Sequence, residues 1–244
     1  SQTLAPGSHH LVVYRSTETQ EIPEPFNCTP FLGVLSGTVP IFISQIGDEE
    51  LKYPDGVALK FEADQMIRIE AHYLNTTGQP IQAKSEIHFE TVDAKKVIHE
   101  AGFLFYGSGD ISIPPFSEFV SKPVFKAPPK GSKVFGLTSH QHHYGTFFEI
   151  EKATSSTGPG TVIYENDNWE EPPVILFDPP LTFADGEGLR WTCTWINTSA
   201  KKVSFGESAN SEMCFLWAYY YPDQGFQCYI KAGFPLPIKG CVVQ

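Results

Sequence analysis

The chain has 244 residues, and 28 Asp and Glu against 17 Lys and Arg give a formal net charge of −11. This charge argues against binding to nucleic acid or to an anionic membrane surface. No apolar run reaches the length of a transmembrane span, and no glycine-rich phosphate loop supports nucleotide binding. The 20 glycines and 20 prolines suit short strands joined by turns.

The apolar residues alternate with polar ones along most of the chain, which predicts β-strands rather than helices. In chain order, we expect strands at residues 11–14, 65–73, 87–91, 134–140, 146–150, 189–195 and 215–221. Turn sequences rich in glycine, proline and asparagine lie between them. The sequence therefore predicts an all-β protein made of antiparallel sandwiches.

Two proline-rich segments, at residues 113–115 and 127–131, stand near the middle of the chain. Histidine groups lie on both sides of them. Domain boundaries tend to fall in such segments. We therefore expect two domains of similar size, residues 1–116 and 117–244.

The five cysteines form no CxxC pair, which argues against a zinc or thioredoxin-type site. They stand in strand-like segments, as expected of disulfides formed in an oxidising compartment. We therefore predict a secreted or periplasmic protein. The odd number leaves at least one thiol unpaired or paired outside the chain.

The first histidine group consists of His9 and His10, at the start of a predicted strand, and His72, near the end of the strand at 65–73. Consecutive residues point to opposite faces of a flat strand. His9 and His10 can therefore share a metal only if the strand is twisted or begins there. Three imidazoles with open coordination positions make a copper or zinc site.

The second group is His140 and His142, which leave the same face of a regular strand, whereas His143 points the other way. Met213, one of only two methionines, closes a polar turn before the strand at 215–221. Two imidazoles and one thioether form a ligand set for copper, and the soft sulfur favours Cu(I). This set indicates redox chemistry rather than a structural zinc.

Four motifs occur in a fixed order: His-His before an apolar strand, His-Tyr-x-Asn, His-x-His-His and Glu-Met-Cys. Together they resemble the type II copper, ascorbate-dependent monooxygenases, the family of peptidylglycine α-hydroxylating monooxygenase and dopamine β-monooxygenase. The resemblance covers nearly the whole chain. It implies two jelly-roll-like β-sandwich domains that face each other across a solvent-filled cleft.

The resemblance also implies one mononuclear copper in each domain. The electron-transfer copper would be held by His9, His10 and His72, and the oxygen-activating copper by His140, His142 and Met213. A disulfide between Cys193 and Cys214 is implied as well. For Cys228, both Cys241 and Cys28 stay open as partners.

The implied activity is hydroxylation of a substrate C–H bond with dioxygen and a one-electron donor such as ascorbate. Thr138, Phe215 and Trp217 stand where the peptidylglycine enzymes hold the peptide carboxylate. We therefore expect an apolar or aromatic small molecule rather than a C-terminal glycine peptide. The alternatives are a copper-binding or copper-sensing protein without catalysis, and an adhesion-type sandwich with incidental histidines.

Overall fold

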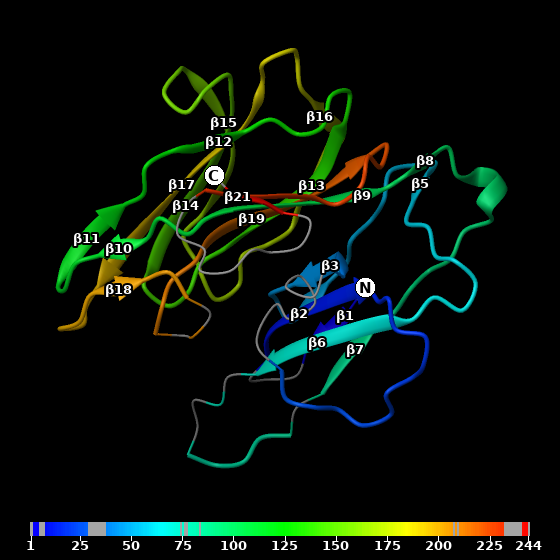
Figure 1. Ribbon diagram of the computed structural model, residues 1–244, viewed down its shortest axis with the longest axis horizontal. Coiled ribbons are helices and arrows are strands. Elements are labelled where there is room, and N and C mark those ends of the chain that lie inside the picture. The colour runs from blue at the N-terminus through cyan, green and yellow to red at the C-terminus, as the bar shows by residue number, and fades with distance from the viewer. Residues whose placement is uncertain are drawn as a thin grey trace.

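The computed structural model is almost entirely β (Figure 1). It describes residues 2–4, 8–28, 38–73, 75, 78–82, 84–206, 208, 210–231 and 241–243. Within these ranges the only helical element is the 3-10 helix η1 (Ala94–Lys96). None of the described segments forms a helix long and apolar enough to span a bilayer. The all-β prediction is confirmed.

A six-stranded sheet, here called the central sheet, runs through the middle of the molecule in the order β16-β13-β19-β9-β20-β21. Its strands are β9 (Gly102–Ser108), β13 (Lys133–His140), β16 (Ile175–Thr182), β19 (Cys214–Tyr221), β20 (Gln227–Lys231) and β21 (Cys241–Val243). β19 is antiparallel to β13 and β9, whereas β20 runs parallel to β9. β9 thus lies beside strands that follow it by about a hundred residues in the chain.

A second sheet covers one face of the central sheet and forms a sandwich with it. Its order is β11-β17-β14-β15, and β12 also pairs with β17. Its strands are β11 (Ser117–Val120), β12 (Val124–Lys126), β14 (Gly145–Ala153), β15 (Gly160–Asn166) and β17 (Gly188–Asn197), and the short pair β10 (Ser112–Ile113) and β18 (Val203–Ser204) lies apart. The core between the sheets includes Trp191 and Trp195.

The remaining strands, here called the N-terminal strands, form three small sheets ordered β3-β2-β6, β4-β1-β7 and β5-β8. They are β1 (Gln2–Leu4), β2 (Ser8–Arg15), β3 (Val39–Ser44), β4 (Asp48–Glu49), β5 (Val57–Ala58), β6 (Ile67–Tyr73), β7 (Ser85–Ile87) and β8 (His99–Glu100). In Figure 1, β1, β2, β3, β6 and β7 lie at the lower right, while β11, β14 and β17 lie at the left.

β19 is buried along its whole length, because both faces of the central sheet are covered. Phe215, Trp217 and Tyr219 share an apolar cluster with Val12 and Ile43 of the N-terminal strands. The alternate residues of β19 belong to the core of the sandwich. Since successive side chains of a strand point to opposite faces, the unbroken apolar run of β19 is explained by burial on both sides.

The expected strands correspond to β2, β6, β13, β14, β17 and β19. The expectation at residues 87–91 is wrong beyond Ile87, where β7 ends. The following side chains are exposed. Their alternating pattern meets no described strand or core surface that would bury one face.

Candidate metal centre

His10 on β2 and His72 on β6 face each other directly in the register of these strands. The His10 Nε2 and His72 Nδ1 atoms are 3.2 Å apart. Two nitrogens that each bind one metal at about 2.0 Å with a tetrahedral angle lie roughly 3.3 Å apart. The pair therefore fits two ligands of one shared metal ion.

The register between β2 and β6 shifts between Ser8 and His10. Such a bulge inserts one extra residue, here His9, and bends the strand. It supplies the local distortion that the sequence required for two consecutive histidines to serve one metal. The side chain of His9 lies outside the described residues, so its role as a ligand stays a prediction.

The second histidine pair lies at the end of a strand and in the turn that follows. β13 ends at His140, and His142 belongs to the turn before β14, here called the histidine turn (residues 141–144). The expectation that both rings leave one face of a regular strand is therefore wrong for His142. The two rings nevertheless come together, with centroids 5.1 Å apart and planes at 89°.

The ring of His142 is held in one tautomer by the backbone. Its Nδ1 lies 2.9 Å from the Ser211 carbonyl oxygen. A carbonyl oxygen only accepts hydrogen bonds, so Nδ1 carries the hydrogen and Nε2 keeps a lone pair. Metal-binding histidines are oriented in this way. Burial lowers the pKa of His142 to about 4, against its usual 6.5, so the ring is neutral as a ligand must be.

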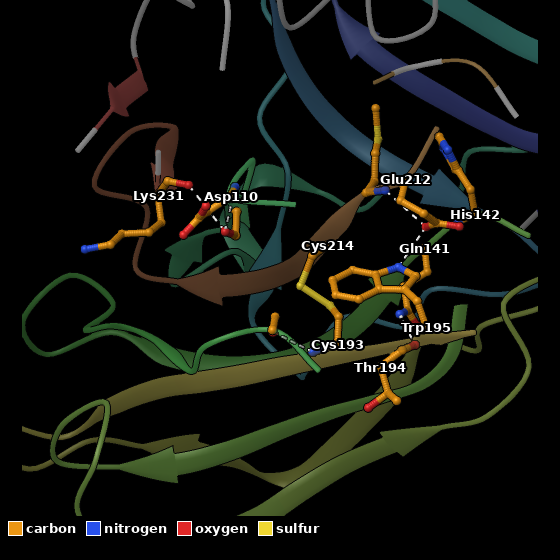
Figure 2. The surroundings of a disulfide bond; sticks show 12 residues. Asp110, Gln141, His142, Cys193, Thr194, Trp195, Glu212, Cys214 and Lys231 are labelled. Atoms are coloured by element: carbon orange, nitrogen blue, oxygen red, sulfur yellow. Dashed lines mark hydrogen bonds between the residues drawn. A yellow bond between two sulfur atoms is a disulfide. The ribbon is translucent and has the colours of Figure 1, made fainter. Parts of the chain in front are cut away.

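Glu212 connects the histidine turn to Met213, and the sequence reasoning missed it. Its fully buried carboxylate accepts hydrogen bonds from the backbone N–H of His142 at 2.9 Å, Tyr144 at 2.8 Å and Met213 at 3.2 Å. Figure 2 shows the Trp195 indole reaching the same carboxylate, at 2.9 Å. Burial raises the pKa of Glu212 to about 7, although these donors act in the opposite direction.

Met213 is buried next to the start of β19, in the cluster shared with Phe215 and Trp217. The following residue, Cys214, forms the implied disulfide with Cys193 on β17 (Figure 2). That prediction is confirmed. The disulfide links the Met213 segment to β17, the strand that carries Trp195. The Trp195 indole in turn donates a hydrogen bond to Glu212.

The structure also decides between the two partners left open for Cys228. Cys228 on β20 forms a disulfide with Cys241 on β21. Cys28 is an exposed free thiol. The described residues therefore contain two disulfides, Cys193–Cys214 and Cys228–Cys241.

The two histidine groups adjoin each other in this structure. The His10 and His140 ring centroids are 5.7 Å apart, edge to face, and both rings are buried. These two rings therefore meet directly rather than across a solvent-filled gap. In the described part of the chain, no three His, Cys, Asp or Glu side chains converge on one point. Each expected ligand set includes a member outside that count, namely the His9 side chain and the Met213 thioether.

The three residues expected near the substrate are all buried. The Thr138 hydroxyl donates to the Pro172 carbonyl at 3.2 Å. The Phe215 ring lies 4.9 Å from the Phe105 ring, tilted by 33°. The Trp217 ring lies 5.0 Å from that of His140. Trp217 therefore stands beside a candidate ligand, and a substrate-binding role for the three residues stays a prediction.

The described part of the chain is thus a β-sandwich that gathers imidazoles and a buried thioether near its strand ends, and these are groups that bind copper. Residues 119–234, which include His140, His142 and Met213, match the sequence model of the copper type II ascorbate-dependent monooxygenase, C-terminal domain. This part of the chain, which carries the second histidine group, is therefore similar to the C-terminal domain of that family. A comparison with curated proteins gave no significant match.

Proposed function

We propose that this protein hydroxylates a C–H bond of a small molecule, with dioxygen as oxidant and ascorbate or a similar one-electron donor as reductant. The observation that carries the proposal is the joint position of His142 and Met213, whose backbone N–H groups bind one oxygen of Glu212 within the family-matched region. Copper, when bound, supplies one-electron transfer and the activation of dioxygen.

The proposal includes two mononuclear copper sites, one in residues 1–116 and one in residues 117–244. β9, from the first of these parts, completes the central sheet of the second. The first site uses His9, His10 and His72, and the second uses His140, His142 and Met213. The 3.2 Å separation of the His10 and His72 nitrogens supports the first. The Nε2 lone pair of His142 and the soft Met213 sulfur support the second.

The expected substrate is apolar or aromatic, because Thr138, Phe215 and Trp217 offer no charge to a peptide carboxylate. The expected compartment is oxidising, either secreted or periplasmic. The disulfides Cys193–Cys214 and Cys228–Cys241 support it, since such bonds persist mainly outside the cytosol.

The decisive experiment loads the metal-free protein with copper under anaerobic conditions and then adds ascorbate, dioxygen and a panel of small apolar and aromatic compounds. We expect two coppers per chain and oxygen consumption coupled to a hydroxylated product. Stoichiometric copper without any coupled product would favour the copper-binding or copper-sensing alternative. No tight copper binding would favour the adhesion-type sandwich.

Met213→Ala tests the same site from the ligand side. Removing the thioether is expected to abolish hydroxylation, because the second copper loses the ligand that favours Cu(I). The fold should survive, as shown by an unchanged circular dichroism spectrum and a cooperative unfolding transition. Full activity in this variant would refute the assignment.

A further inference from the structure

We propose that Gln45 is a positioning residue that fixes the ring tautomer of His140. The two residues meet where the N-terminal strands pack against the sandwich, a contact here called the junction. The inference rests on the proposed copper site and adds a residue to it. Gln45 follows β3, and His140 ends β13, so 95 positions separate them in the chain.

The orientation of the Gln45 amide follows from its two shortest contacts. Its nitrogen, Nε2, donates to the Ser139 carbonyl oxygen at 2.7 Å. Its oxygen, Oε1, lies 2.6 Å from the Nδ1 atom of His140. The reversed amide would place its oxygen against the Ser139 carbonyl, and two acceptors do not bind each other. His140 Nδ1 is therefore the donor, and the lone pair of the ring is on Nε2.

The two histidines of the second site thus receive the same tautomer from different parts of the chain. His142 obtains it from the Ser211 carbonyl, within the sandwich. His140 obtains it from Gln45, which directly follows β3 of the N-terminal strands. Loss of such an acceptor typically weakens metal binding by about 10- to 100-fold. The copper site of the sandwich is therefore incomplete without the N-terminal strands.

Gln45 is held in place by polar contacts on both sides of it in the sequence. The backbone N–H of Ile43 donates to the Tyr219 hydroxyl at 3.1 Å. The Glu49 carboxylate accepts from the backbone N–H of Val174 at 3.0 Å. Gln45 itself is 4% exposed. The segment is therefore anchored to the central sheet, which gives the Gln45 amide a defined position against His140.

The first test measures the nitrogen NMR signals of the histidine rings in the metal-free protein, with His140→Gln used to assign the His140 signals. We expect His140 to show the Nδ1–H tautomer in the native protein and to lose this preference in Gln45→Met. In Gln45→Glu, a protonated carboxyl can donate to the Ser139 carbonyl through one oxygen and accept from Nδ1 through the other, so this variant should restore the preference at a pH where the carboxyl is protonated. Gln65→Met is the control, because Gln65 also donates to backbone carbonyls, those of Ser16 and Met66, without contacting His140.

The second test measures Cu(I) affinity by competition with a chelator. Gln45→Met should lower the Cu(I) affinity of the second site by about 10- to 100-fold. This is the same site whose affinity Met213→Ala lowers, and Gln65→Met should leave its affinity unchanged. If Gln45→Met does not fold, the shorter Gln45→Asn takes its place. An unchanged His140 tautomer and unchanged affinity would overturn the proposal. A native protein that binds no copper would refute the proposed function instead, while the metal-free tautomer measurement would still decide the role of Gln45.

Discussion

At the scale of a single residue, Glu212 holds the histidine turn and Met213 in position relative to each other through its hydrogen bonds. We expect Glu212→Ala to lower the free energy of unfolding by about 3 kcal/mol or more, because several buried N–H groups lose their acceptor and each costs about 1–3 kcal/mol. Trp195→Phe removes the indole donor at 2.9 Å and part of a fully buried ring, and should cost about 1–3 kcal/mol. Urea unfolding of both variants measures the difference. A smaller loss in Glu212→Ala than in Trp195→Phe would contradict this account.

The candidate ligands could be found from the sequence, but the residues that position them could not. His140, His142 and Met213 are visible because imidazole and thioether have few other uses in such a combination. Glu212 and Gln45 have no such chemistry, and their partners are distant in the chain, 70 positions for the His142 N–H and 95 for His140. The signal available for Glu212 was an acidic residue directly before Met213 and the apolar run at residues 215–221.

At the scale of the element, β19 shows what an apolar pattern predicts and what it omits. The run at residues 215–221 correctly predicted a strand. It did not show that the Phe215 and Trp217 faces meet the N-terminal strands, because a pattern apolar on both faces does not name its partners. The strand at 87–91 failed for the complementary reason: alternation is informative only where a sheet exists to bury one face.

The disulfide at the start of β19 should matter for copper as well as for stability. Replacing both Cys193 and Cys214 with Ala removes a crosslink across 21 positions, and replacing Cys228 and Cys241 removes one across 13. Chain entropy predicts a loss of about 3 kcal/mol for each. Only the first double variant should also weaken copper binding at the Met213 site, because Cys214 adjoins that ligand.

Unfolding curves and Cu(I) titrations of the two double variants make this comparison. The Cys228 and Cys241 variant is the matched control, since its stability loss should be similar and its position is on the β20–β21 pair. Equal loss of copper affinity in both variants would show that general stability, rather than the local brace, controls the site.

At the scale of the whole molecule, the central sheet joins the two parts of the chain. Its one face packs on the second sheet of the sandwich, and its other face packs on the N-terminal strands. The sequence predicted sandwiches but not this sharing, because the pairing of β9 with β19 joins residues far apart in the chain. The direct contact of the His10 and His140 rings depends on the same packing.

Glu49 lies at this junction and should make the stability of the whole molecule depend on pH. Burial raises the pKa of its carboxyl above the ordinary 4.5, although hydrogen bonds with Ser44, Val174 and Gln45 act in the opposite direction. A raised folded-state pKa means that the folded protein holds the proton more tightly than the unfolded chain. Its stabilising contribution is therefore fully present below pH 4.5 and is lost as the pH rises through the folded pKa.

Glu49→Gln removes the ionisation while its amide oxygen can still accept from the Val174 N–H. We therefore expect the unfolding free energy of the variant to fall less than that of the native protein as the pH rises from 4.5 through the folded pKa of Glu49, with the remaining fall coming from Glu212, whose pKa is also raised by burial. Glu50→Gln is the control, because Glu50 is exposed and paired with Lys52 at 3.2 Å, and it should keep the native slope. Urea unfolding over a pH series gives the slopes. A Glu49→Gln slope equal to that of the native protein would show that the charge at this junction does not govern the stability of the molecule.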